Sequence, residues 1–243
     1  MKSLRSFTFT CIIWAFILMV NHVTNGAKLP KTSTCILEKN TNITCQENTT
    51  LETFTDYIKT SIKNTTEIKH INLINCYIPS LPEAMFTNLN LTKLRTIEIR
   101  NCNLEKIHTK TFLELHSLTN LTIRDNNLRE LQANQFTGMR DSLQFLDLDH
   151  NNIQIIPSFT FNGLNQLMYL ILSNNNLTVL KQDFLQSSVY IEYLTLRNSN
   201  IRMIEKQAFG FISNLRIIDL SENQITHLNE GAFMGLNEIE VLN

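Results

Sequence analysis

The chain has little glycine and proline, no excess of charge of either sign, and no long apolar run after its first residues. Six Gly and four Pro among 243 residues are too few for long flexible linkers. A formal net charge of −1 gives no reason to expect a nucleic acid or an anionic membrane as partner. With 43% hydrophobic residues, the chain is not predicted to be disordered.

The sequence also lacks the motifs of common enzymes. It contains no G-x-S-x-G, no H-E-x-x-H and no glycine-rich phosphate loop. The mature histidines are scattered, and none has a cysteine or an acid at metal-ligand spacing. Some aspartates fall on one predicted face, but solvated carboxylates are a simpler interpretation than a calcium site. We therefore predict no catalytic residue, no metal and no cofactor.

The first 26 residues differ from the rest. Lys2 and Arg5 precede an apolar stretch over residues 7–20, and small residues follow at Thr24 and Gly26. This order is typical of a secretory signal peptide cut near Gly26, the alternative being a retained signal anchor. No later run of 18 apolar residues occurs, so no other membrane span is predicted. We expect a secreted, extracellular protein.

Secretion determines how the cysteines and asparagines are interpreted. Cys11 would leave with the signal peptide, and the other cysteines would enter an oxidising compartment. Six N-x-[ST] triplets follow the signal peptide and predict a glycoprotein. The predicted glycosylation sites are Asn42, Asn48, Asn64, Asn90, Asn120 and Asn176.

A repeat dominates the remaining sequence. The template L-x-x-L-x-L-x-x-N/C-x-L recurs seven times, and an eighth copy stops in its strand. The alternation in its L-x-L core predicts one short strand in each coil. A phenylalanine closes the second half of each repeat, and these rings should stack into a spine. The first template positions are Ile68, Leu94, Leu118, Leu143, Leu167, Ile191, Leu215 and Ile239, and the phenylalanines are Phe86, Phe112, Phe136, Phe161, Phe184, Phe209 and Phe233.

This pattern resembles the extracellular 24-residue class of the leucine-rich repeat family. The resemblance implies a curved solenoid, with a parallel β-sheet on the concave side and irregular or 3₁₀ segments on the convex side. The segments at residues 127–139, 151–164 and 224–236 resemble repeats of animal Toll-type and Slit-type ectodomains. The resemblance implies a recognition module of innate-immune or adhesion receptors, which binds a protein.

We predict three parts: a signal peptide at residues 1–26, an N-terminal cap at 27–67, and repeats at 68–243. An end coil exposes apolar core and a strand edge, so a cap is physically required. The number and spacing of the cysteines predict a disulfide between Cys35 and Cys45 in this cap. Pairing of these cysteines elsewhere is the alternative. The usual cap more often carries four closely spaced cysteines, and this chain departs from it.

The chain stops inside its eighth repeat without a second cysteine cluster. Three interpretations follow. The sequence is a fragment of a longer receptor or matrix protein, a short form that pairs its open end with another chain as a dimer, or a secreted decoy of a full-length receptor. A structural adhesion or matrix glycoprotein remains the alternative to a recognition module.

The predicted binding site lies on the concave side, where strand positions form columns down the sheet. One column changes from small polar residues to a run of aromatic and apolar ones, and exposed aromatics are favoured in protein interfaces. Apolar residues are also common at this position in the family without any partner. The candidate residues are Phe145, Asp147, Tyr169, Ile171, Tyr193, Arg197 and Ile217.

Cys76 and Cys102 occupy the template position where other repeats carry Asn126 or Asn175. An asparagine there can donate to and accept from neighbouring backbone groups. Cysteine fits the same place as a small buried residue with a weak donor. We predict two unpaired thiols; a disulfide between adjacent coils or a functional site are the alternatives.

Overall fold

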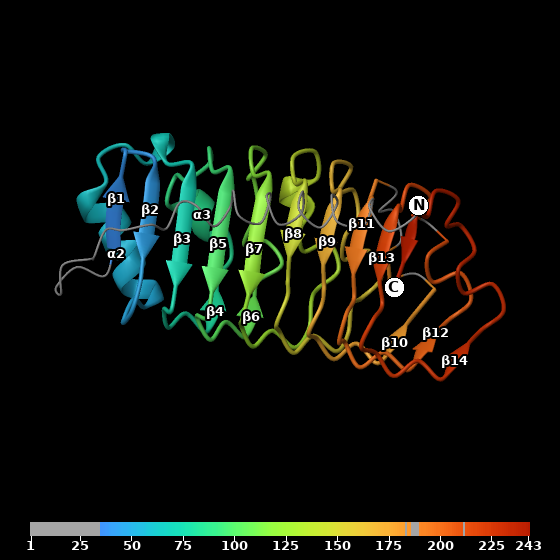
Figure 1. Cartoon of the computed structure of the whole chain (residues 1–243). Helices are drawn as coiled ribbons and strands as arrows, with labels where there is room; N and C mark the ends of the chain where they lie inside the picture. Colours follow the sequence, from blue (N-terminus) through green and yellow to red (C-terminus); the bar gives the residue numbers. More distant parts are fainter. Residues whose placement is uncertain (1–34, 183, 186–189, 211) are drawn as a thin grey trace, which may run out of the picture. The chain divides into compact units, whose positions relative to one another are not determined.

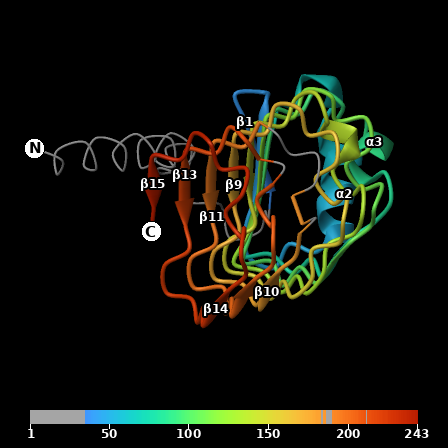
Figure 2. The same ribbon diagram turned by 90° about the vertical axis from the view of Figure 1, so that its right-hand side faces the viewer.

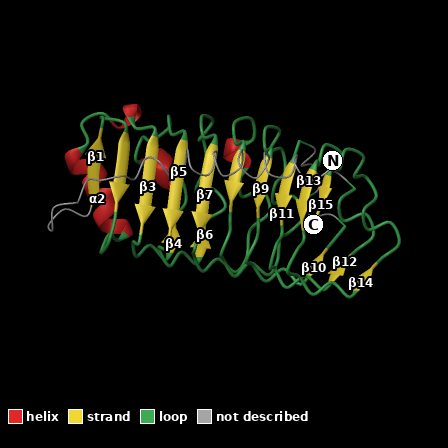
Figure 3. Cartoon of the chain, viewed as in Figure 1, coloured by secondary structure: helices red, strands yellow, loops and turns green. Residues whose placement is uncertain are grey.

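The computed structural model describes residues 35–182, 184–185, 190–210 and 212–243. The predicted signal peptide and residues 27–34 of the predicted cap therefore lie outside the described residues. The described part is built on one sheet whose ten strands stand side by side (Figures 1 and 3). In spatial order, they are β1 (Cys35–Glu38), β2 (Asn42–Cys45), β3 (His70–Ile74), β5 (Thr96–Arg100), β7 (Asn120–Arg124), β8 (Phe145–Asp147), β9 (Tyr169–Ile171), β11 (Tyr193–Thr195), β13 (Ile217–Asp219) and β15 (Val241–Leu242).

From β2 onward, all pairs of this sheet are parallel and stay in register with the repeat. Each strand residue therefore lies beside the residue at the same template position of the next coil. Inward residues such as Leu121 and Ile123 are fully buried, while their outward neighbours alternate with them along the strand. The predicted leucine-rich repeat solenoid with one short strand per coil is confirmed.

One end of the sheet carries a hairpin and a helix. β1 pairs antiparallel with β2, and a disulfide joins Cys35 and Cys45, which face each other in this register. Helix α2 (Leu51–Ser61) begins at Thr50, whose side chain and backbone exchange hydrogen bonds with Thr53 in a capping box. Phe54 is fully buried, so the helix is held by its apolar face. The predicted disulfide between Cys35 and Cys45 is confirmed.

The side opposite the sheet carries turns and helical segments, and short strands such as β10 (Val179–Leu180) and β14 (His227–Leu228) lie along the lower edge (Figures 1 and 2). The repeat that starts at Ile68 is 26 residues long and contains a helical turn; the one at Leu118 is 25 long and contains a 3₁₀ turn. Longer repeats thus accommodate their extra residues away from the sheet. The other short elements are α3 (Met85–Asn88), η1 (Thr65–Glu67), η2 (Thr137–Met139), β4 (Ser80–Leu81), β6 (Lys106–Ile107) and β12 (Met203–Ile204).

The repeated phenylalanines form the predicted spine. Phe86, Phe112, Phe136 and Phe161 stack with ring centroids 5.9 to 6.2 Å apart and are essentially fully buried. In later coils, Phe209 stacks on Phe233 and meets Phe184 edge to face. Each ring fills the space between its own coil and the next, so burial of these rings joins the coils.

A left-handed turn follows every strand of the repeats. The residue just before the asparagine position has φ between +49° and +59° in all seven repeats. Asparagine, aspartate and histidine tolerate this conformation better than other side chains do. Six of the seven positions carry one of these types, and Glu222 is the exception. The residues are Asn75, Asn101, Asp125, His150, Asn174, Asn198 and Glu222.

The buried asparagines tie neighbouring coils together. Asn126 donates its side-chain N–H groups to the carbonyls of Ile99 and Arg124, at 2.9 and 2.8 Å. Its Oδ1 accepts from the backbone amides of Cys102 and Leu104, at 3.0 and 3.1 Å. One buried side chain thus satisfies four backbone groups of two coils.

Cys102 and Ser199 fill the same place with a smaller hydrogen-bonding capacity. Cys102 Sγ lies 3.2 Å from the carbonyls of Leu73 and Arg100, and so reproduces the donor half. Cysteine has no side-chain oxygen to accept from the neighbouring coil, and its backbone carbonyl accepts instead. The Ile78 amide donates to the Cys102 carbonyl at 2.9 Å. The Ser199 carbonyl accepts from the Leu177 amide in the same way. A cysteine or serine is therefore tolerated without leaving that amide unpaired.

Cys76 and Cys102 are both free thiols, as predicted, and both are buried. A hydrogen bond between the two side chains, together with burial, raises the pKa of the Cys76 thiol above its ordinary value. A protonated, buried thiol is a weak nucleophile. The structural role of these cysteines accounts for their position.

Candidate protein-binding face

The outward strand residues form what we call the sheet face. Its first column contains the residue that starts each strand, and its second column contains the residue two places later. The third column follows the second by two further residues and includes Arg124, Asp149 and Arg197. The first column reads Asn42, His70, Thr96, Asn120, Phe145, Tyr169, Tyr193 and Ile217.

The predicted aromatic residues are brought together by β8, β9, β11 and β13. We call Phe145, Tyr169, Tyr193 and Ile217 the aromatic segment of the first column. The ring centroids of Phe145 and Tyr169 lie 6.3 Å apart and those of Tyr169 and Tyr193 lie 6.2 Å apart, both tilted. These are favourable aromatic distances. Tyr169, Tyr193 and Ile217 are half-buried and keep part of their surface available.

Two candidate residues are less exposed than their strand positions predict. Phe145 is 6% exposed and Asp147 is 5% exposed. Phe145 is covered because the ring of Tyr169 packs against it. Asp147 lies between Thr122 and Ile171 on the neighbouring strands, where adjacent side chains in parallel register leave little open surface. The expectation that both are open contact residues is corrected.

Asp147 carries the most perturbed carboxyl of the face. Burial raises the pKa of Asp147 to about 6, although a hydrogen bond from the Asp149 amide and the nearby Arg124 charge act in the opposite direction. Its Oδ1 accepts from the Asp149 amide at 2.9 Å. The folded chain therefore holds a proton on this carboxyl at pH values where an unfolded chain has lost it.

A polar network beside Asp147 was not anticipated from the sequence. Asp149 pairs with Arg124 at 3.3 Å and His150 at 2.9 Å, and it accepts from Asn174 at 2.8 Å. The partners sit about one repeat away or next to Asp149 in the chain. A search for opposite charges one repeat apart in the same column could have found the Arg124–Asp149 pair.

The other charged candidate, Arg197, is exposed and forms an ion pair with Glu222. Both side chains are about half exposed, at 52% and 55%, so the pair contributes little to stability and remains free to exchange partners. Ser173 hydrogen-bonds Thr195 at 2.7 Å beneath it, and its Oγ accepts from the Arg197 amide. Ile171, the remaining candidate, is half-buried on β9. Charged and apolar groups thus meet along β9, β11 and β13.

The first column over β2 to β7 has a different character. His70 and Thr96 hydrogen-bond each other at 2.8 Å. Burial, followed by the charges of Arg95 and Lys69, lowers the pKa of His70, which favours the neutral ring. Glu98 is 6% exposed in the second column and pairs with Arg100. This half presents small polar groups without aromatic rings.

The predicted glycosylation sites fall in two places. Asn42 and Asn120 lie on the sheet face and are half-buried. Asn48, Asn64 and Asn90 are exposed in turns outside the sheet, and Asn64 also caps η1 by accepting from the Thr66 amide. Asn176 is half-buried beyond the turn after β9 and accepts from Asn200 at 3.1 Å.

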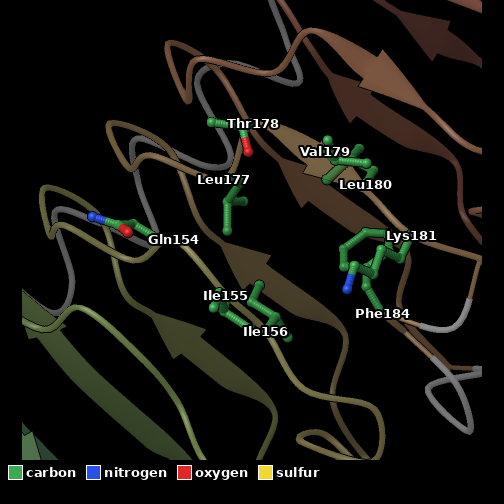
Figure 4. Close-up of a pocket in the computed structure, with 9 residues that line it drawn as sticks. All are labelled: Gln154, Ile155, Ile156, Leu177, Thr178, Val179, Leu180, Lys181 and Phe184. Atoms are coloured by element: carbon green, nitrogen blue, oxygen red, sulfur yellow. The ribbon is translucent and has the colours of Figure 1, made fainter.

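A cavity of about 180 Å³ lies away from the sheet face, between the coils of Ile155 and Val179 (Figure 4). Glu130 bridges to Ile155 and β10 pairs with β12, but no strand pairing links Ile155 to Val179 among the described residues. This break opens the cavity. Its lining has one ionisable side chain and is otherwise mostly apolar, comprising Gln154, Ile155, Ile156, Leu177, Thr178, Val179, Leu180, Lys181 and Phe184.

Within the part of the chain that the structure describes, no group of three or more histidine, cysteine, aspartate or glutamate side chains could hold a metal ion. The same part contains no helix with both the length and the apolar content needed to cross a membrane. The arrangement on the sheet face can bind a surface.

The leucine-rich repeat profile matches residues 92–153, 141–189 and 189–243, which is well over half of the chain. The chain belongs to the leucine-rich repeat family. No curated protein matches this leucine-rich repeat chain at a significant level.

Solved structures share the fold. One is a TLR13–ssRNA13 complex, with a TM-score of 0.71 and 24% identity, covering 80% of this chain and 26% of that one. Another is the mouse RP105/MD-1 complex, with a TM-score of 0.67 and 19% identity, covering 82% of this chain and 33% of that one. The leucine-rich repeat chain thus spans about a quarter to a third of these chains and resembles Toll-type ectodomains.

Proposed function

We propose that this leucine-rich repeat protein is an extracellular recognition module that binds a protein through the aromatic segment of its sheet face. The observation that carries the proposal is the contact row of Phe145, Tyr169 and Tyr193 on three adjacent strands, with both tyrosines half-buried. Partly exposed tyrosines held rigidly by neighbouring rings are favoured anchors of protein interfaces, because little side-chain entropy is lost on binding.

The surroundings of this row have the composition of an interface rim. Ile171 and Ile217 extend the apolar surface, and Arg197 and Glu222 border it with exposed charges. Interfaces commonly combine an apolar centre with such a polar border. The leucine-rich repeat fold serves generally as an interaction scaffold, which agrees with a binding role.

A protein partner fits this surface better than a nucleic acid does. Asp149, Asp219 and Glu222 outnumber Arg197 on the face over β8 to β13, whereas phosphate binding needs clustered lysine or arginine. The two structural neighbours are an RNA complex and a protein complex. Their low identity leaves the choice to the chemistry of this face, and binding of RNA becomes one outcome of the test.

The extracellular location rests on three features of the chain. Residues 1–26 have the composition of a secretory signal peptide, the Cys35–Cys45 disulfide is present, and six glycosylation triplets follow. The hairpin, the disulfide and α2 fit the proposed N-terminal cap at residues 27–67, because they cover one end of the repeats at 68–243. An innate-immune role belongs to the same proposal.

The test is a screen of the secreted chain against an array of extracellular proteins, with a structured single-stranded RNA as an additional probe. The double variant Tyr169→Ala plus Tyr193→Ala should lower the affinity for a protein hit at least about a hundredfold, as expected for two interface anchors. The matched control is Tyr77→Ala plus Tyr190→Ala, which removes two exposed tyrosines that lie outside the sheet face.

The control separates the proposal from its alternatives. If both double variants lose affinity equally, the rings of Tyr169 and Tyr193 are structural. The same conclusion follows if the Tyr169/Tyr193 variant is destabilised as much as Phe161→Ala. A salt-sensitive RNA hit that survives the tyrosine changes would point to a nucleic-acid receptor. Hits that depend on other surfaces would favour a structural adhesion glycoprotein.

A further inference from the structure

Two glycosylation triplets lie in the same column of the sheet face. Asn42 pairs with His70, His70 with Thr96, and Thr96 with Asn120, so the first column has an acceptor asparagine at each end of this stretch. Three strand spacings separate the two, about 14 Å. Beyond Asn120, the column continues directly into the ring of Phe145.

The two asparagines have the same local hydrogen bonding. Thr41 Oγ1 donates to Asn42 Oδ1 at 2.9 Å, and Thr119 Oγ1 donates to Asn120 Oδ1 at 2.8 Å. In both residues the preceding threonine fixes the side-chain oxygen and directs the amide nitrogen away from it. That nitrogen makes no hydrogen bond to the described residues, and it is the atom that carries an N-linked glycan.

The residues between these asparagines are polar. His70 and Thr96 stand between them, are half-buried and hydrogen-bond each other. Thr44 and Thr122 complete the two triplets from the same side of their strands, since strand residues two apart share a face. A glycan at Asn42 would cover polar groups, and one at Asn120 would stand between the polar Thr96 and the ring of Phe145.

From this geometry, we propose that N-glycans on Asn42 and Asn120 cover the sheet face from β2 to β7 and confine protein docking to β8 to β13. The proposal rests on the extracellular function proposed above. It assigns the two halves of one column to opposite roles: the polar half carries carbohydrate, and the aromatic half contacts protein. The glycan on Asn120 marks the border between them.

The modification is an ordinary substitution. The amide nitrogen of the asparagine forms a bond to the anomeric carbon of a lipid-linked oligosaccharyl diphosphate. The bond from that carbon to the diphosphate oxygen breaks, the lipid diphosphate leaves with the electron pair, and a proton is lost from nitrogen to a base. The co-reactant and its transferase belong to the secretory pathway, and the triplet hydroxyl completes the recognition.

The first experiment measures whether Asn42 and Asn120 carry glycans. The chain is expressed in secreting eukaryotic cells, glycans are released enzymatically in heavy-oxygen water, and peptides are sequenced by mass spectrometry. Asn42 and Asn120 should carry the label. Thr122→Ser should retain the label at Asn120 and Thr122→Val should abolish it, with equal secretion of both variants. Unlabelled Asn42 and Asn120 in secreted, folded protein would overturn the proposal.

The second experiment measures how far the glycans cover the sheet face, and it needs no protein partner. Thr96→Cys places a thiol between the two asparagines, and Ile217→Cys places one in the aromatic segment. Each is reacted with a maleimide on a long polyethylene glycol chain, with and without the added changes Asn42→Gln and Asn120→Gln. Loss of the glycans should accelerate labelling at position 96 at least about threefold and leave position 217 unchanged, because only the first site is screened from a bulky reagent.

Small iodoacetamide, which passes between sugars, should label position 96 at the same rate in both backgrounds. Equal polyethylene glycol labelling at position 96 with and without glycans would refute the coverage. If both thiol variants fold poorly, as judged by their melting curves, peptide-level protection from protease, with and without Asn42→Gln and Asn120→Gln, replaces the labelling. None of these measurements involves Tyr169 or Tyr193, so a missing protein partner leaves them interpretable.

Discussion

Strands β7 and β11 are nearly the same sequence and differ in what they present. Residues 120–124 read N-L-T-I-R, and residues 193–197 read Y-L-T-L-R. Both bury their inward leucine completely, and both place threonine in the second column. Asn120 stands where Tyr193 does, so one half of the face has a glycosylation triplet, the proposed carbohydrate acceptor, and the other has an aromatic ring.

The arginines at the ends of these strands show the same division. Arg124 is 30% exposed and pairs with Asp125 and Asp149, so it belongs to a partly covered network. Arg197 is 52% exposed and has Glu222 as its partner. The comparison teaches that the repeat prescribes the inward residues and leaves the outward ones free to differ. The proposed binding function therefore rests on positions that the fold does not constrain.

The largest expected effect lies in the part that both halves share. Phe136→Ala should cost about 4 kcal/mol of unfolding free energy, because a fully buried ring stacked on both sides leaves a cavity. Phe233→Ala should cost clearly less, since that ring is only half-buried. Urea denaturation followed by circular dichroism measures both. Equal costs would argue that the spine does not transmit packing between coils.

A second prediction compares the asparagine position in the two halves. Asn126→Ala should cost about 3 kcal/mol, because four backbone groups lose their partner. Ser199→Ala removes a hydroxyl that donates to two carbonyls and should cost about 1 kcal/mol, since the Ser199 carbonyl still accepts from Leu177. The same denaturation assay applies. A Ser199 variant as unstable as the Asn126 variant would contradict the proposed backbone substitution.

A third prediction concerns Asp147 and has a characteristic pH dependence. Burial raises the pKa of Asp147 to about 6, so its contribution to stability is full at low pH and is lost as pH rises through about 6. Asp147→Asn keeps an oxygen for the Asp149 amide and should stabilise the fold by about 2 kcal/mol at pH 7.5, with the gain vanishing near pH 4.

The matched control for that change is Asp219→Asn. Asp219 accepts from the Ser221 amide with the same geometry at 2.9 Å but is half-buried, so little change is expected. Melting temperatures at pH 7.5 and pH 4.5 distinguish the two variants. A gain at Asp147 that persists unchanged at low pH would show that relief of a buried charge is not its cause.

The repeat period of the sequence predicted most of the fold. Once the template was in phase, the strands, the buried phenylalanines and the place of Cys76 and Cys102 followed from it, because each coil repeats the environment of the previous one. The left-handed turn was also visible in Asp125, His150 and Asn174, which directly precede Asn126, Asn151 and Asn175 and tolerate this conformation. The repeat period is a strong signal of the fold because it determines which side chains of each coil are buried.

The details of the site were harder to predict. Alternation along a strand told which residues face outward, but not that Phe145 and Asp147 would be covered by residues of adjacent strands. Burial of an outward residue depends on the size of its neighbours one repeat away, and on their conformations. The Asp149 network with Arg124 and Asn174 has the same origin, since those partners come from the two adjacent coils.

The placement of α3 and η2 in the two longer repeats bears on how such a chain can change its length. Extra residues are accommodated at the back, and the strand that follows keeps its alignment, as Asn120 and Phe145 do across a 25-residue step. An insertion within a strand would instead turn every later inward side chain outward. Gain or loss of a complete coil would move the aromatic segment along the stack by one strand spacing, about 4.8 Å, and preserve both faces.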